Sequence, residues 1–89
     1  MNHELKSWPR FFSRVVAGEK VHELRRNDRA YSVGDILTLR EFDPEMQRYS
    51  GRRARVMVTY LTSEECTCAE SEHALAPGFV IMSIRLLDE

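Results

Sequence analysis

The chain is a series of short apolar segments separated by turn residues, which limits it to a small, sheet-rich fold. Residues 53–61 show the pattern most clearly, because apolar and polar side chains alternate there and the apolar ones would share one face of a strand. The apolar positions are Ala54, Val56, Val58 and Tyr60. Comparable segments predict further strands at residues 2–6, 21–26, 36–42 and 79–87.

One early segment has helical spacing instead. Ser7 suits the N-cap, Pro9 suits the first turn, and four apolar side chains follow at the intervals of one helical face. They are Phe11, Phe12, Val15 and Val16. Gly18 stands where a left-handed residue would end the helix. We expect an α+β fold in which about five strands form a small, closed or nearly closed β-barrel, with this N-terminal helix plugging one end.

Length and composition restrict the class of protein. With 89 residues, 43% hydrophobic and 30% charged, the chain can build one core, so we expect a single domain over residues 1–89. No run of eighteen apolar residues that could cross a bilayer is present, and the first residues lack the apolar stretch of a secretory signal. We therefore expect a soluble, cytoplasmic monomer with no membrane partner.

The charges are unevenly distributed along the chain. Residues 25–55 contain eight arginines and carry a local balance of +3, whereas residues 56–89 carry −5. Four of the arginines surround a predicted hairpin: Arg48, Arg52, Arg53 and Arg55. Arginine matches phosphates well, so these side chains are candidates for tracking a phosphate backbone, although they could equally keep a strand edge soluble.

The segment 62–77 is predicted to be a loop with a helical turn near residues 70–75. It contains Cys66, Cys68 and His73, which would supply only three zinc ligands where a structural site needs four. A disulfide between the two cysteines would make a strained ring and could not join distant parts of the fold. We therefore expect free thiols, no metal and no cofactor.

The strand at residues 21–26 carries the main candidate site. Alternation places Leu24 and His22 on one face, which we assign to the core, and Glu23 and Arg25 on the other face, toward a cleft or solvent. Lys20 precedes the strand and can turn toward Glu23. Together the three charged groups offer donors and an acceptor, as reading a base edge requires. The alternative is an ion-pair cluster that holds the helix against the barrel.

Neighbouring residues extend this candidate site. Arg26 and Arg29 would flank the opening of the cleft, and an exposed aromatic side chain at Trp8 or Tyr31 could stack on a base. The alternative for Trp8, which we favour, is a helix-start residue half buried against the barrel. Structural roles are expected for three positions at turns: Gly18, Gly34 and Asp35.

The pattern G-x-K-x-x-E-x-R from Gly18 to Arg25 resembles the ASCH domains of the PUA-like superfamily of small β-barrels. Further similarity lies in the segments H-E-L-K, E-L-R-R-N-D-R, V-G-D-I-L-T-L-R-E-F-D-P and G-F-V-I-M-S-I-R, which together look like a small, uncharacterised bacterial and phage branch. The resemblance implies a cleft beside the helix that binds RNA or modified nucleobases. Lys20, Glu23 and Arg25 would line it, and Gly18 would allow the turn.

Some ASCH relatives are amidohydrolases that remove an acyl group from a modified cytidine, with a threonine nucleophile and the motif lysine as its base. Glu23 replaces that threonine, so the covalent mechanism is not carried over. An enzyme would have to use Glu23 as a general base on water, with Lys20 or Arg25 stabilising the developing oxyanion. We expect an RNA-binding or nucleotide-binding module, with a small amidohydrolase or a protein-interaction or inhibitor module as alternatives.

Overall fold

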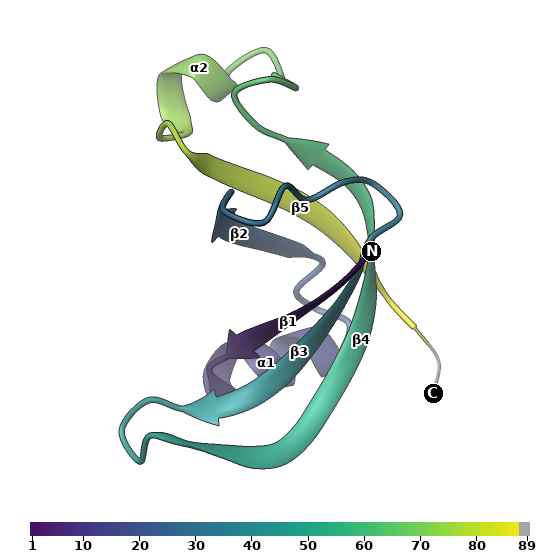
Figure 1. Ribbon diagram of the computed structural model, residues 1–89, viewed down its shortest axis with the longest axis vertical. Coiled ribbons are helices and arrows are strands. Elements are labelled where there is room, and N and C mark those ends of the chain that lie inside the picture. Colours follow the sequence, from purple (N-terminus) through teal and green to yellow (C-terminus); the bar gives the residue numbers. More distant parts are fainter. Residues whose placement is uncertain (88–89) are drawn as a thin grey trace.

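A computed structural model describes residues 1–87 and contains five strands and two short helices in this part of the chain (Figure 1). In chain order these are β1 (Asn2–Ser7), α1 (Pro9–Val16), β2 (His22–Arg26), β3 (Ile36–Asp43), β4 (Arg48–Thr62), α2 (Ser71–Ala74) and β5 (Phe79–Leu86). The predicted strands and the early helix are therefore all present, and α2 lies within the predicted helical turn.

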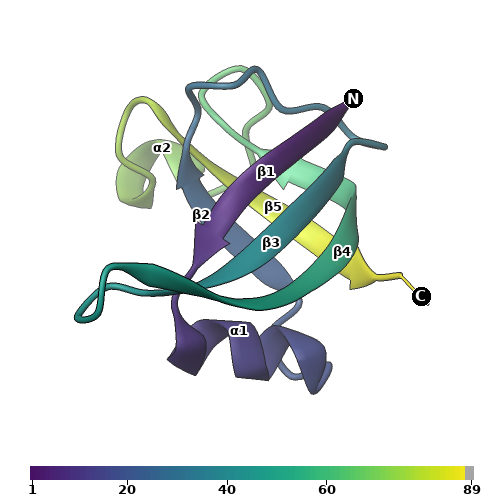
Figure 2. The ribbon, with the colours of Figure 1, turned by 60° about the horizontal axis from the view of Figure 1, so that its bottom comes forward.

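The five strands form one sheet in the order β1-β3-β4-β5-β2. β1 runs parallel to β3, and the other neighbours are antiparallel. The long strand β4 pairs with β3 through its first part and with β5 through its second part. Irregular register in both pairings is of the kind that bends strands and increases twist, and the sheet curls into a half-barrel (Figures 1 and 2). β1 and β2 are its two edges.

The core lies inside this curl. Strands β3, β4 and β5 contribute Leu37, Leu39, Val56, Val58 and Met82, which are completely buried. The helix α1 adds Phe12 and Val15 to the same cluster, as their spacing on one face predicts.

The sequence correctly predicted an α+β domain, mostly sheet with few helices. It predicted a closed or nearly closed barrel, whereas the sheet curls into a half-barrel and no ladder joins β1 to β2 within residues 1–87. Details of α1 also differ. Phe11 and Val16 remain substantially exposed, because only the Phe12 and Val15 side of this short helix meets the core. Ser7 is not the N-cap: it is the last residue of β1, and Trp8 precedes the helix without a side-chain cap. The role of α1 as a plug for a PUA-like barrel stays a prediction.

The inward face of β2 is the reverse of the one predicted. Glu23 is 3% exposed, whereas Leu24 is 58% exposed and His22 is also exposed. Leu24 and His22 therefore do not belong to the core. The pairing with β5 explains this result, because directly paired residues share a face. Glu23 pairs with the buried Met82, and Leu24 pairs with Ile81 on the outer surface.

Two tyrosines also differ from expectation. Tyr60 is exposed, because the register irregularity between Val58 and Tyr60 breaks the alternation that would have placed both on the core face. Tyr31 is buried and contacts the His3 ring edge to face, with 4.9 Å between ring centroids. Burial raises the pKa of Tyr31, and the nearby Arg29 and Arg25 oppose that rise. Tyr31 is thus a core residue and not a stacking platform.

Asp35 connects the start of β1 to the turn before β3. Gly34 in this turn has a φ of +96°, which favours glycine. The Asp35 Oδ2 atom accepts hydrogen bonds from His3 Nε2 at 2.9 Å and from the Ser32 N–H at 3.0 Å, and Oδ1 accepts one from the Met1 ammonium at 3.1 Å. Burial raises the pKa of Asp35, but these hydrogen bonds outweigh burial and hold the pKa below its usual value.

Replacement of Asp35 by Asn should lower the free energy of unfolding by about 1–3 kcal/mol at neutral pH, because charge-assisted hydrogen bonds are lost. The lowered pKa means that the unfolded chain takes up the proton more readily than the folded chain. The stability contributed by Asp35 is therefore complete above the unfolded pKa of about 3.9 and is lost as the pH falls through the folded pKa. Urea unfolding of both proteins from pH 7 to pH 2 measures the difference.

Asp28→Asn is the matched control, since Asp28 is exposed and lies 3.9 Å from Arg29. We expect it to change stability by less than about 0.5 kcal/mol. A difference between Asp35→Asn and the unchanged protein that stayed constant down to pH 2 would contradict the role given to this carboxylate.

Candidate functional site

The candidate site begins where α1 ends. Gly18 adopts the predicted left-handed conformation with a φ of +78°, and the N–H groups of Glu19 and Lys20 donate to the Arg14 carbonyl at 2.9 and 3.1 Å. These bonds satisfy the end of the helix and turn the chain sharply into β2. The turn places Lys20 immediately before the strand that carries Glu23 and Arg25.

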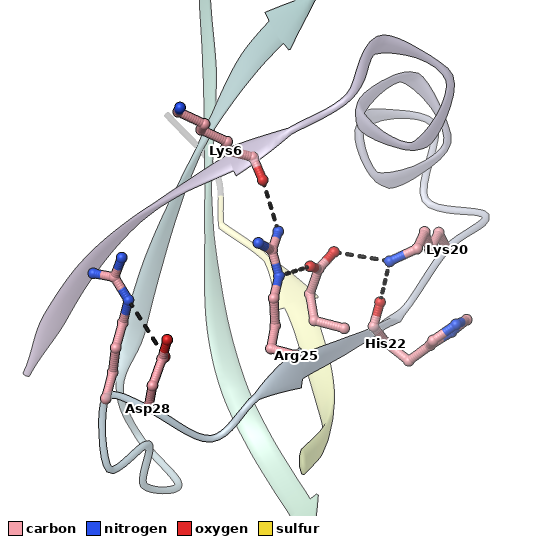
Figure 3. A network of polar contacts seen from close by, with 7 residues as sticks. Lys6, Lys20, His22, Arg25 and Asp28 are labelled. Atoms are coloured by element: carbon pink, nitrogen blue, oxygen red, sulfur yellow. Dashed lines mark hydrogen bonds and ion pairs between the residues drawn. The ribbon is translucent and has the colours of Figure 1, made fainter. Parts of the chain in front are cut away.

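The three charged side chains converge on one carboxylate. Lys20 Nζ donates to Glu23 Oε2 at 2.8 Å and to the His22 carbonyl at 2.6 Å, and Arg25 Nε donates to Glu23 Oε1 at 2.9 Å. Lys20 and Arg25, both labelled in Figure 3, therefore each bond a different oxygen of this carboxylate. The Glu23 side chain is 5% exposed, whereas those of Lys20 and Arg25 are 20% and 25% exposed. The carboxylate is thus buried and compensated, while both cations still reach solvent.

Arg25 also spans the open side of the half-barrel. Its Nη2 atom donates to the Lys6 carbonyl on β1 at 2.9 Å (Figure 3). The sheet order makes β1 and β2 opposite edges, and no backbone ladder joins them within residues 1–87. The planar arginine fork can bond two acceptors in different directions, so this one side chain links Glu23 on β2 to the edge of β1.

A cavity of about 550 Å³ opens beside this bridge, and we call it the aromatic cavity. Its apolar lining comes from Trp8, Phe11 and Leu24. Its charged lining residues are Lys6, Lys20, Glu23 and Arg25, and Ser7 and His22 complete it. The Trp8 and Phe11 rings are stacked with 6.3 Å between centroids and an interplanar angle of 27°. Trp8 is 50% exposed and Phe11 is 42% exposed. A concave surface with apolar walls and a few converging polar groups is typical of ligand sites.

The other predicted ligand-binding residues lie elsewhere. Arg29 lines a neighbouring hollow that also contains Arg25 and Lys6. Arg26 stacks over the Phe79 ring at 4.8 Å and does not line the aromatic cavity. Phe11 and Leu24 were not predicted at the site, because their apolar character assigned them to the core. Lys6 was not predicted there, because β1 is distant from β2 along the chain.

The four hairpin arginines do not form one cluster. Arg53 pairs directly with Arg40 of β3, so it lies on the opposite face of β4 from the buried Ala54. Arg52 lies 3.8 Å from a Glu41 carboxylate oxygen and its guanidinium lies 5.1 Å from the Phe12 ring centroid. The aromatic cavity and the hollow beside it are lined by other residues and not by Arg48, Arg52, Arg53 or Arg55. Their proposed phosphate contacts stay a prediction.

The loop before β5 carries two free, exposed thiols at Cys66 and Cys68. A hydrogen bond from the Glu70 N–H and one from the Ser71 side chain hold the pKa of Cys68 below its usual value. His73 lies 3.5 Å from a Glu72 carboxylate oxygen. Over the described residues 1–87, the structure brings together no group of three or more side chains suited to a metal ion.

Sequence comparison places the site within a family. The model of a family described as "Domain of unknown function (DUF3850)" matches residues 2–84, which include every residue of the aromatic cavity. The chain belongs to this family.

A relative of the DUF3850 chain is an "Uncharacterized 12.9 kDa protein in GpA 3'region" from Escherichia phage P2. The two are 35% identical over 60 residues, which cover 67% of the chain and 53% of the phage protein. The chain therefore spans about half the length of this relative. None of the helices in the described part of the chain is long and apolar enough to cross a membrane.

The buried carboxylate predicts a strong effect of Glu23→Gln on the stability of this DUF3850 domain. Loss of the negative charge leaves two cations facing each other across a neutral amide, and we expect the free energy of unfolding to fall by about 1–3 kcal/mol. Glu19→Gln is the matched control, because Glu19 bonds Arg14 at 2.6 Å on the exposed surface. Chemical unfolding monitored by Trp8 fluorescence compares them, and equal losses for both variants would contradict the structural importance of the Glu23 cluster.

Proposed function

We propose that this protein binds RNA or a nucleotide-like ligand, with a base or modified base held in the aromatic cavity. The observation that carries the proposal is the meeting of two stacked, exposed aromatic rings with a buried carboxylate that two cations hold. An exposed aromatic ring alone is common on protein surfaces. Its position beside an ordered set of charged donors and acceptors is what favours a ligand.

Stacking would supply the affinity that does not depend on sequence. Trp8 and Phe11 line the cavity and are 50% and 42% exposed, and Leu24 adds a further apolar contact. Base stacking on an aromatic side chain contributes about 1–3 kcal/mol per base. Apolar side chains at such exposed positions are consistent with a surface that a ligand covers.

The charged cluster would read the edge of the base. The Glu23 carboxylate uses one lone pair on each oxygen to accept from Lys20 and Arg25, and it can accept further hydrogen bonds. Lys20 and Arg25 each have N–H groups beyond those that their protein contacts use. The cavity therefore combines acceptors and donors, as a nucleobase edge requires.

The resemblance to the ASCH domains supports the same proposal, and membership of the PUA-like superfamily is part of it. Hydrolysis of an acylated nucleoside, interaction with a protein, and a cytoplasmic location stay predictions.

Binding of labelled single-stranded RNA, followed by fluorescence anisotropy, tests the proposal. Replacement of Trp8 by Ala should weaken binding by about 5- to 100-fold, because a base loses its stacking partner. Tyr60→Ala is the matched control, since Tyr60 is similarly exposed but does not line the aromatic cavity. Equal effects of the two substitutions would argue against binding at this cavity.

The same titration at several salt concentrations tests the contact with the nucleic acid backbone. For single-stranded RNA we expect log affinity to fall linearly with log salt, by roughly 0.7 for each phosphate that the protein neutralises. Negligible binding at both low and moderate ionic strength would remove RNA as the ligand.

A further inference from the structure

A second hollow, of about 340 Å³, lies next to the aromatic cavity, and we call it the cationic hollow. Four of its lining residues are of cationic type, Lys6, Arg25, Arg29 and Arg40, and one is a carboxylate residue, Glu4. These residues come from β1, β2, the turn after β2, and β3. The fold therefore concentrates positive charge from distant parts of a chain whose formal net charge is −1.

The two hollows adjoin each other. Lys6 and Arg25 line both of them, and the hydrogen bond from Arg25 Nη2 to the Lys6 carbonyl joins the two shared residues. Figure 3 shows Arg25 reaching toward Lys6 at this junction. Neighbouring groups of a single small molecule could therefore occupy both hollows at once.

Aromatic contacts hold two of the cations while leaving N–H donors available. The Arg40 guanidinium stacks over the Tyr49 ring at 4.0 Å, and Lys6 Nζ lies 4.3 Å from the Phe42 ring centroid. A guanidinium stacked on a ring presents its N–H groups around its edge. The Arg40 and Lys6 side chains are thus held in place by ring contacts that do not neutralise their charge.

The carboxylates beside Arg29 and Arg40 hold these two arginines only weakly, whereas Arg25 Nε is bonded to Glu23 at 2.9 Å. Arg40 Nη1 is 3.7 Å from a Glu4 oxygen and Arg29 Nε is 3.9 Å from an Asp28 oxygen, both longer than a hydrogen bond. The excess positive charge and the available donors together favour an anion with several acceptor oxygens. A phosphate group has this chemistry.

We propose that the cationic hollow binds the phosphate of a nucleotide whose base occupies the aromatic cavity. This inference rests on the proposed function and narrows it, because it makes the ligand a nucleotide and not a free base or a nucleoside. Arg25 belongs to both sites, because it bonds Glu23 beside the base and also lines the cationic hollow. Arg29 and Arg40 line only the cationic hollow, so their substitution tests phosphate binding separately from base binding.

Fluorescence of Trp8, the single tryptophan of the chain, tests the inference by measuring ligand binding. The full chain is titrated with the four ribonucleosides and with their 5′- and 3′-monophosphates. We expect at least one monophosphate to bind roughly tenfold or more tightly than its nucleoside, because of charge-assisted hydrogen bonds to the arginines. Inorganic phosphate should compete with that monophosphate and not with the nucleoside.

Substitutions test whether the tighter binding of the monophosphate comes from the cationic hollow. Arg40→Gln should remove most of the preference for the monophosphate and leave nucleoside affinity unchanged. Arg53→Gln is the matched control, since Arg53 pairs with Arg40 across β3 and β4 but does not line the cationic hollow. Arg29→Gln supplies a second test at a more exposed side chain should Arg40→Gln destabilise the fold.

The outcomes separate the inference from the function on which it rests. Equal affinity for nucleosides and monophosphates, or a preference that survives in both Arg29→Gln and Arg40→Gln, would overturn the phosphate site and leave base binding intact. No response of Trp8 to any nucleoside, monophosphate or RNA would overturn both. A preference lost in Arg40→Gln and kept in Arg53→Gln would support the assignment.

Discussion

The carboxylate of Glu23, buried on an edge strand and held between two cations, is the interaction on which the rest of the site depends. An inward-facing carboxylate is costly unless it is paired and hydrogen-bonded, and Lys20 and Arg25 each bond one of its oxygens. Their contacts allow Glu23 to lie on the inner face of the sheet, beside its buried strand partner Met82. As a consequence, Leu24 is turned outward, where it lines the aromatic cavity.

The same cluster addresses the weak point of a half-barrel. A curled sheet that does not close leaves two edges with unpaired backbone groups, which are prone to unwanted pairing. Arg25 satisfies one such group, the Lys6 carbonyl, and links the edges by a side chain instead of a ladder. A side-chain link leaves space on both sides, and the aromatic cavity and the cationic hollow occupy those two spaces. The proposed function thus resides where the sheet fails to close.

The arginines of this DUF3850 protein divide into groups with different surroundings. Arg25, Arg29 and Arg40 meet at the cationic hollow, although they come from separate elements. Arg26 stacks on Phe79, and Arg52 lies near Glu41 and Phe12. Local charge balance along the sequence indicated an excess of positive charge over residues 25–55 and pointed to the hairpin arginines. The curl of the sheet, which brings β1 and β3 toward β2, adds a further group of arginines at the cationic hollow.

Local features were determined by the sequence itself: the five strands, the early helix, the left-handed Gly18 and the convergence of Lys20, Glu23 and Arg25. Each depends on spacing within a few residues, through alternation, helical periodicity or a turn. Only the tertiary structure decided that Glu23, and not Leu24, faces inward, and that Tyr60 leaves the core face. Strand alternation separates two faces but does not identify the buried one, which depends on the cross-strand partners. The meeting of Lys6, Arg25 and Arg40 likewise required the curled sheet, because no local rule connects residues so far apart in the chain.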